Sequence, residues 1–544
     1  MRNYWTRSPC LMVVLLALLA AGLAAYLDYA KFASTFNKED SVLAFQLVAL
    51  IAAMLAAVGL LARRAPALFD AVARAPLRGL ALAGAAAGTV TLGALAAMGA
   101  EAAQLLAADA AVVLLVVLLL AHEALRLLAA RTAVAPGEGV GSLAGIRAAL
   151  FLFMLAEELS RSFLPLYVRE LYTPLPGLSD TLAMGLPIAL FMLLVAVFTP
   201  FAGVWADRFG SRRTLLFGTL PAVAGFVGTA AAQTLPELLV WRSACALGYA
   251  VMFIGAQGFI ARHTGRQDRA RGMAQFVVAV VVAGLCGAPV GGILADHLGP
   301  RTVFWVSAAL ALASALAARG LLPSEAPERA ERAVAWRDYA LVLANRRFQA
   351  LLLLSSVPTK VMLTGWLFYL VPVHLHDLGA TPATIGRTMM AYGLTIVLLG
   401  PWLSRMADRS GRHALFAGAG GLVGGGGALA VLHSPGPAAV LAGVAALGLA
   451  HALNNATQLA LVPEVARAEC ARIGRTSVFA IYRLLERAGA VLGPVIAAAL
   501  ADWFGAVAAL GALGVLSLLT SAAFCAVFVR DAAALPQTVG EGAP

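Results

Sequence analysis

Three charged residues lie together inside an apolar stretch of the sequence, residues 146–168. Glu157, Glu158 and Arg161 stand near its middle, and a charge at the centre of a membrane helix costs about 2.5–3.5 kcal/mol on insertion scales. On one helix both carboxylates can reach Arg161, because residues three and four apart share a face. The spacing predicts a site where a carboxylate exchanges a proton or binds a substrate cation. The alternative is a neutralised group that only lets a structural helix insert.

A second group of charges has the opposite balance. Arg483, Glu486 and Arg487 leave one excess positive charge, which an organic anion or a carboxylate elsewhere in the chain can balance. They lie near the predicted inner end of their segment, so snorkelling to the surface is the alternative. Lys360 follows Pro358, a residue that frees a backbone carbonyl and loosens a helix as a gate requires. The alternative is a lysine that only lines a solvated cavity.

Two adjacent amides, Asn454 and Asn455, lie in the apolar stretch 438–460. In an apolar setting an amide needs a hydrogen-bond partner, from a substrate or from a neighbouring helix. Hydrogen bonding between helices is favoured over substrate binding for this pair.

The elements that carry these residues are long apolar segments. The 544-residue chain is 61% hydrophobic and 12% charged, against roughly 25% charged in a soluble domain. This composition excludes a disordered chain, a disulfide-stapled module and a nucleic-acid-binding domain. It predicts an all-α polytopic membrane protein, because most segments have about the 20 residues that cross a bilayer. The sixteen candidates are 11–30, 42–62, 79–99, 103–123, 146–168, 182–204, 214–232, 238–260, 274–295, 303–321, 349–372, 383–403, 414–432, 438–460, 477–500 and 504–529.

The positive charges report the topology of these segments. With the N-terminus inside, 29 of the 39 Lys and Arg residues lie in the alternate stretches assigned inside, and only five lie in those assigned outside. This distribution follows the positive-inside rule. It places both termini in the cytoplasm and makes the net charge of +11 a sign of topology and not of a polyanionic ligand.

No cofactor or metal is predicted. The five cysteines have no CxxC pairing or regular spacing, so they indicate neither a disulfide framework nor a metal site. No GxxxxGK[ST] loop occurs, which argues against ATP hydrolysis as the energy source. No nucleophile and base pair emerges, so an enzyme is not predicted. The first segment follows Arg2 and Arg7 and has a cleavable signal peptide as its alternative reading.

Two motifs occur twice at nearly the same separation. The run Asp207-Arg208-Phe-Gly210 returns as Asp408-Arg409-Ser-Gly411, 201 residues later, and Ala-Pro289-Val returns as Gly493-Pro494-Val, 205 residues later. Such duplication is common in transporter folds. Six spans in each copy predict a bundle at 141–320, a cytoplasmic connector at 321–347, a second bundle at 348–530 and a tail at 531–544. Each copy starts and ends inside, so the two are related by an axis along the membrane normal.

The loop Gly203-Val-Trp-Ala-Asp207-Arg208-Phe-Gly210-Ser-Arg212-Arg213 resembles the signature of the major facilitator superfamily between its second and third helices. The second copy lies where that family has it, between the eighth and ninth. Arg242 with Gly248 is similar to the fourth-helix motif, and Gly287-Ala-Pro289-Val-Gly291-Gly292 is similar to the fifth-helix motif of antiporters. The resemblance covers roughly the last 390 residues.

The resemblance implies three sets of functional residues. Arg242 corresponds to a position tied to proton coupling and joins the charged and amide residues above. A conformational gating set would latch and release the inside ends of the helices: Gly203, Asp207, Arg208, Gly210, Arg212, Arg213, Asp408, Arg409, Gly411 and Arg412. A helix-packing set would let backbones approach closely: Gly287, Pro289, Gly291, Gly292, Gly489, Gly493 and Pro494.

The function predicted is secondary active transport of a small organic solute by alternating access, with proton coupling and with efflux by antiport favoured over uptake by symport. The partners predicted are that solute, protons and the lipid bilayer of a bacterial-type inner membrane, with no nucleic acid. Residues 1–140 form an extension of about four further helices, for accessory packing or partner binding. The alternative function is a membrane receptor that keeps the transporter fold without transporting. The oligomeric state is not predicted.

Overall fold

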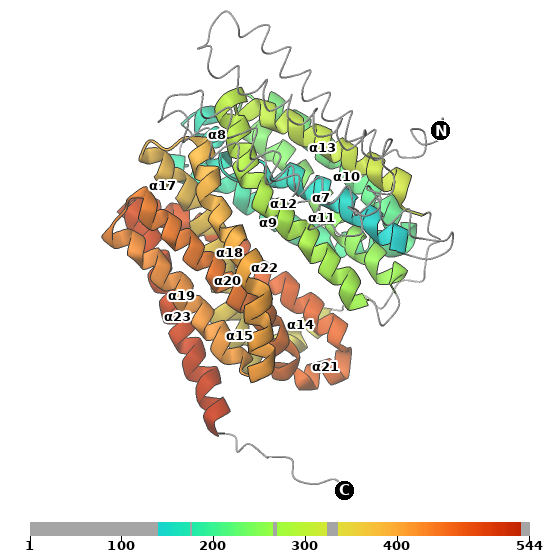
Figure 1. Cartoon of the computed structure of the whole chain (residues 1–544), viewed down its shortest axis with the longest axis vertical. Helices are drawn as coiled ribbons and strands as arrows, with labels where there is room; N and C mark the ends of the chain where they lie inside the picture. The colour runs from blue at the N-terminus through green and yellow to red at the C-terminus, as the bar shows by residue number, and fades with distance from the viewer. Residues whose placement is uncertain (1–139, 175–176, 265–268, 324–335, 535–544) are drawn as a thin grey trace, which may run out of the picture. The chain divides into compact units, whose positions relative to one another are not determined.

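A computed structural model describes residues 140–174, 177–264, 269–323 and 336–534 (Figure 1). Helices dominate these ranges, and eleven of them are long and apolar enough to cross a membrane. The prediction of an all-α polytopic fold is therefore confirmed. The N-terminal extension predicted at 1–140 and most of the predicted tail lie outside the described residues.

Ten long unbroken helices follow the predicted apolar segments. Glycines with positive φ separate several consecutive pairs, including Gly210 (φ 83°), Gly299 (φ 80°) and Gly505 (φ 84°), because a residue without Cβ turns the chain tightly at little cost. The helices are α9 (Asp180–Phe209), α10 (Ser211–Ala231), α11 (Leu235–His263), α12 (Arg269–Leu298), α13 (Pro300–Leu321), α18 (Pro382–Ser410), α19 (His413–His433), α20 (Pro437–Val465), α22 (Arg475–Phe504) and α23 (Ala506–Ala534).

The first segment of the duplicated core is broken into α7 (Val140–Glu158) and α8 (Leu164–Leu171). The continuous helix assumed for residues 146–168 is therefore wrong. Pro165 has no N–H to donate to the carbonyl four residues earlier, so a regular helix cannot run through this point. The Ser160 hydroxyl donates to the Glu157 carbonyl (3.3 Å) at the end of α7. Arg161 therefore lies in the turn after α7 and not within a helix.

The first segment of the second copy is continuous over Arg346–Asp377 but irregular. It consists of α15 (Arg346–Leu351), the π-helical turns η1 (Leu352–Ser356), α16 (Val357–Val361), the π-helical turns η2 (Met362–Leu370) and α17 (Val371–Asp377). Each π-helical stretch is followed within two residues by a proline, Pro358 or Pro372. Because proline cannot make the regular hydrogen bond, the helix widens there instead of breaking. Two short helices, α14 (Trp336–Leu343) and α21 (Arg467–Ile473), complete the described elements.

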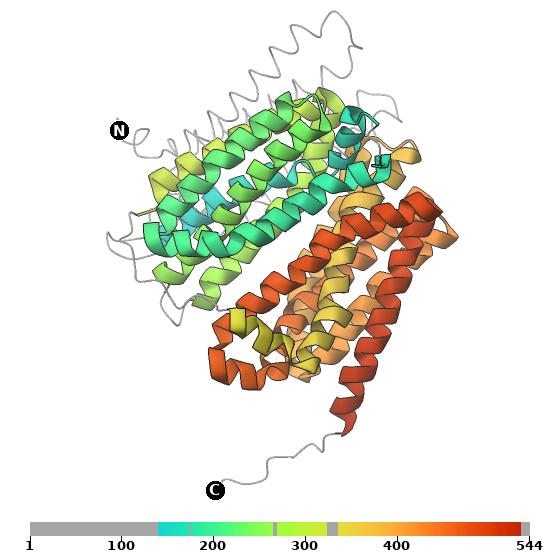
Figure 2. The ribbon, with the colours of Figure 1, turned by 180° about the vertical axis from the view of Figure 1, so that it is seen from behind.

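The described chain forms two compact units. Unit 1 contains residues 140–160, 198–231, 247–264 and 269–323, and unit 2 contains residues 161–174, 177–197, 232–246 and 336–534. Within unit 1, α7 packs against α12 and α13, and α10 packs against α13 (Figure 1). Within unit 2, α19 packs between α20 and α23, and α22 runs along α16 and η2 (Figure 2).

Glycines hold the broken segment of unit 1 against α12. A Cβ at Gly291 would overlap the carbonyl of Leu159, and one at Gly287 would overlap the side chain of Glu158. The backbone of α12 therefore lies directly on the end of α7 and the turn that follows, an approach that only glycine permits.

The same contact recurs in unit 2. A Cβ at Gly489 would lie 2.9 Å from the Cβ of Lys360, and one at Gly493 would lie 3.1 Å from the carbonyl of Val361. Gly489 and Gly493 follow Gly287 and Gly291 by 202 residues, and Lys360 follows Glu158 by the same number. Each copy of the repeat thus packs a glycine face on an irregular segment.

We expect Gly291→Ala to destabilise the protein by about 1–3 kcal/mol, because the added methyl overpacks a backbone contact. The matched control is Gly284→Ala in the same helix, where nothing lies within 4 Å of an added Cβ. Alanine there gains about 0.5–1 kcal/mol in helix propensity. Thermal unfolding in detergent measures both. Equal melting temperatures for the two variants would contradict the close contact.

Candidate functional site

The two predicted carboxylates of the first copy lie at the end of α7 in unit 1. Glu157 is buried, with 2% of its surface exposed, and Glu158 is half-buried against Gly287. Arg161 belongs to unit 2, where its guanidinium carbon lies 4.5 Å from the ring centroid of Phe368. The π face of the ring attracts the cation. This contact between Arg161 and Phe368 was not predicted from the sequence.

A charged triad in unit 2 contains one buried carboxylate, Glu486. The Arg483 Nη1 donates to Glu486 Oε1 at 2.9 Å, and the Lys360 Nζ lies 4.0 Å from Glu486 Oε2. The Glu486 side chain is 7% exposed, whereas those of Lys360 and Arg483 are 22% and 54% exposed. One buried carboxylate therefore balances two cations from α16 and α22, the arrangement that makes a buried charge tolerable. Arg487 is half-buried on the same helix.

A layer of neutral polar side chains joins α20 to η1 and α16. Asn454 Nδ2 donates to Thr359 Oγ1 (3.2 Å), and Gln458 Nε2 donates to Ser355 Oγ (2.9 Å) and to Thr359 Oγ1 (3.1 Å). All four side chains are buried. The side-chain amide of Asn454 therefore forms a hydrogen bond between helices, whereas Asn455 is exposed. Gln458 and Ser355 were not predicted from the sequence. The signal was present, because Gln458 follows Asn454 by one helical turn.

Six side chains join the ends of unit 2 that the charge distribution predicts to face outside. Arg169 Nη1, on α8, pairs with Asp377 Oδ1 at the end of α17 (3.1 Å). The hydroxyls of Ser179 and Thr181 both donate to the carboxylate of Asp502, near the end of α22. Tyr369 OH donates to the carbonyl of Thr181 (2.7 Å). None of these contacts was predicted from the sequence.

Arg242 is also part of unit 2. It is buried, and its guanidinium carbon lies 4.9 Å from the ring centroid of Phe191 on α9. A cation on an aromatic face in an apolar interior is held strongly enough to fix the side chain.

The gating motif makes ionic contacts within each unit. In unit 1, Asp207 Oδ1 lies 3.2 Å from Arg262 Nη2, which also donates to the carbonyl of Ala206 (3.0 Å). Arg212 Nη2 donates to the carbonyl of Arg319 (2.7 Å). The aspartate thus ties the end of α9 to the end of α11. Arg262 was missed because its role depends on a contact 55 residues away in sequence.

In the second copy of the motif the aspartate, Asp408, lies near a histidine, His413, whereas Asp207 of the first copy pairs with an arginine. His413 Nε2 lies 3.5 Å from Asp408 Oδ1, and His413 Nδ1 lies 3.5 Å from Glu464 Oε1. The imidazole of His413 therefore lies between the two carboxylates. The remaining predicted basic residues of the two motifs are exposed: Arg208, Arg213, Arg409 and Arg412. Gly203 has no atom within 4 Å of an added Cβ, whereas Gly210 and Gly411 have positive φ.

The described residues contain no group of three His, Cys, Asp or Glu side chains placed to hold a metal ion. Glu486 and Lys360 lie at the centre of an ionic and polar candidate site in unit 2, and Glu157 and Glu158 lie in unit 1.

Comparison with known proteins decides the family. The profile described as Major Facilitator Superfamily matches residues 147–469 and 361–543. The chain belongs to this superfamily. The resemblance drawn from the signature loop is therefore confirmed, and the chain is an integral membrane protein of a transporter family.

Two relatives carry the name Multidrug resistance protein MdtG. The protein from Klebsiella pneumoniae (strain 342) is 28% identical over 271 residues, covering 48% of this chain and 64% of the relative. The protein from Salmonella choleraesuis (strain SC-B67) is 26% identical over 270 residues, covering 48% and 65%. The chain thus spans less than two thirds of the length of these relatives.

Solved transporter structures share the fold. The peptide transporter POT in complex with sulfate has a TM-score of 0.58 at 16% identity, covering 72% of this chain and 94% of its own. The human organic anion transporter MFSD10 (TETRAN) has a TM-score of 0.52 at 16% identity, covering 72% and 100%. At these identities the likeness extends to the fold alone.

Glu486→Gln is expected to destabilise the protein by about 1–3 kcal/mol, because it leaves partly buried cations without their acceptor. Adding Lys360→Met is expected to recover part of the loss. Thermal unfolding in detergent checks both variants. Glu170→Gln, at an exposed carboxylate of α8, is the control that should not change. An equally stable Glu486→Gln variant would show that the triad does not stabilise the interior.

Proposed function

We propose that this superfamily member exports a small organic solute across a bacterial inner membrane in exchange for protons, with both termini in the cytoplasm. The observation that carries the proposal is the buried Glu486 carboxylate between Lys360 and Arg483. A buried carboxylate that is paired with cations changes its contacts when it gains or loses a proton. The multidrug resistance relatives support export over uptake.

Protonation of Glu486 would act through its neighbours. The neutral acid no longer attracts the Lys360 ammonium, which then becomes available to an anionic or polar group of the solute. Release of the proton restores the ion pair and expels that group. Glu157 and Glu158 are the second pair of carboxylates proposed to take up protons, since both lie at the end of α7 in an apolar segment.

Alternating access would require the outer contacts of unit 2 to separate. Arg169 and Asp377 are exposed, and an exposed pair contributes only about 0–1 kcal/mol. Such a contact can therefore break and reform during a transport cycle. Asp377 ends the same continuous segment that carries Lys360, so the outer contact and the triad share one segment.

Proton coupling predicts a pH change that depends on these carboxylates. In lightly buffered proteoliposomes, a panel of organic cations, anions and sugars is added, and the internal pH is followed by a trapped dye. We expect a solute that drives proton movement in the wild type to lose that effect in Glu486→Gln and in the double variant Glu157→Gln and Glu158→Gln. Glu170→Gln is the control. Undiminished proton movement in all variants contradicts the coupling, and binding without flux favours the receptor alternative.

Locking the outer contacts is expected to stop transport. Thr181→Cys and Asp502→Cys are introduced together into a chain whose five native cysteines are replaced by alanine, because the two side chains touch in unit 2. Oxidation should abolish solute flux and a reductant should restore it. Each single cysteine variant is the control. Full flux through the oxidised, cross-linked protein would refute alternating access at this end.

A further inference from the structure

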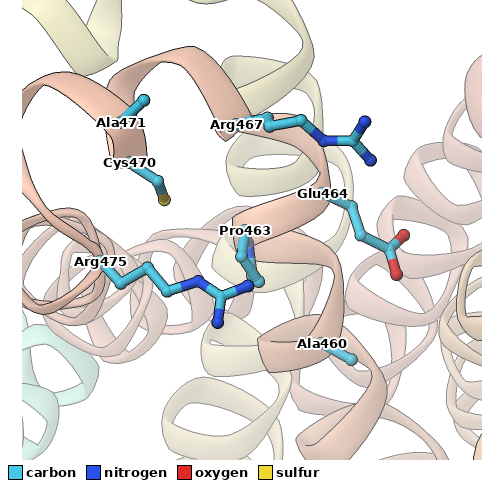
Figure 3. Close-up of a pocket in the computed structure, with 7 residues that line it drawn as sticks. All are labelled: Ala460, Pro463, Glu464, Arg467, Cys470, Ala471 and Arg475. Atoms are coloured by element: carbon cyan, nitrogen blue, oxygen red, sulfur yellow. The ribbon is translucent and has the colours of Figure 1, made fainter.

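A cavity of about 590 Å³ lies at the junction of α20, α21 and α22 in unit 2 (Figure 3). It is lined by residues between Ala460 and Arg475. None of them belongs to the charged triad or to the outer contacts. The charge distribution of the sequence predicts that this end of the helices faces the cytoplasm, at the level of the lipid headgroups.

Two arginines give the cavity a positive charge. Arg467, at the start of α21, and Arg475, at the start of α22, are exposed and form no ion pair with a described residue. In Figure 3 the Arg475 side chain reaches toward Pro463, and that of Arg467 extends away from Arg475, on the side of Glu464. The acidic side chain of the lining, Glu464, lies 3.5 Å from His413. The lining thus holds two guanidinium groups and one carboxylate, which leaves one excess positive charge.

The backbone adds to this positive charge. The cavity borders the first residue of α22, and Gly474 before it provides no side-chain cap. The first N–H groups of a helix have no partner within the helix, and they attract anions through the helix dipole. Arginine binds phosphate with two parallel hydrogen bonds. The cavity also has the volume usual for a small-molecule site.

We propose that this cavity binds a phosphate group, carried by an anionic phospholipid headgroup or by a soluble phosphate ester. Arg467 and Arg475 would hold its oxygens from two helices. Binding would fasten α21 between the ends of α20 and α22. This site is separate from the proposed transport function and does not rest on it.

Cys470 provides a reporter inside the cavity. Its thiol lines the cavity and is half-buried. Burial raises the pKa of the Cys470 thiol above its usual value, the Arg475 guanidinium partly offsets the rise, and Glu469 adds to it. Alkylation by a neutral maleimide therefore speeds up as the pH rises through this pKa, and it is measured at one fixed alkaline pH.

The test uses the full chain with Cys470 as its remaining cysteine, after Cys10, Cys245, Cys286 and Cys525 are replaced by alanine. The protein is kept in maltoside micelles, which contain no phosphate. One arm adds phosphatidylglycerol to the micelles, and the other adds glycerol 1-phosphate or inorganic phosphate. Sodium chloride matches the ionic strength in every sample, since salt screens exposed charges. The measured quantity is the ratio of alkylation rates without and with the probe.

We expect the alkylation rate to fall about tenfold when a bound probe reaches roughly ten times its Kd. Arg467→Gln and Arg475→Gln should bring the ratio close to one. Arg472→Gln is the matched control, because Arg472 is exposed on the same short helix but does not line the cavity. Taking the ratio within each variant cancels the change in thiol pKa caused by removing Arg475.

Each outcome decides the proposal. Protection by phosphatidylglycerol alone assigns the site to a lipid headgroup, and protection by the soluble phosphates as well assigns it to free anions. No protection of the unsubstituted site by either probe overturns the proposal. Equal protection in Arg467→Gln, Arg475→Gln and Arg472→Gln overturns it too, because the two cavity arginines would then not be the ligands.

Discussion

The structure depends on direct backbone contact between a glycine face and an irregular helix. In hydrocarbon every backbone polar group needs a partner within the protein, and irregular backbone is tolerated only where it is covered. Gly287 and Gly291 cover the break after Glu158, and Gly489 and Gly493 cover the segment around Lys360. A side chain at these glycines would push the covering helix away. The fifth helix of each copy can therefore cover the irregular backbone because it carries glycine at these positions.

Both copies of the repeat keep the contact between glycines and the irregular segment, but the charged residue at that contact differs between them. Glu158 and Lys360 occupy equivalent places, 202 residues apart, yet one is an acid and the other a base. The second copy supplies its own carboxylate through Glu486, which faces Lys360 from α22. The gating motif shows the same divergence, since Arg262 pairs with Asp207 where His413 contacts Asp408. Duplication thus set the backbone geometry, and the side chains diverged into different ionic networks.

The sequence predicted the helical segments well, because hydropathy summed over about 20 residues reports what a bilayer needs. It failed where a few residues change the hydrogen-bond register within a segment. Hydropathy averaged over a whole segment does not reveal the break after Glu158, although Pro165 indicates that the helix is interrupted nearby. The contacts of Arg262, Gln458 and Asp502 could not be predicted, since each joins helices far apart in sequence, and only the folded packing brings them together.

One continuous segment, Arg346–Asp377, connects the features of unit 2. Before its first residue, Asn345 donates to the Val465 carbonyl and to Glu469 on α21, at 2.9 and 3.0 Å. Its middle carries Lys360, and its last residue, Asp377, pairs with Arg169. A rigid α-helix would move all three points together. The π-helical stretches on either side of Lys360 have looser hydrogen bonding than an α-helix, so they are the places where the two ends can shift separately. The same irregular segment therefore carries Lys360 beside Glu486 and joins it to the contacts at both ends.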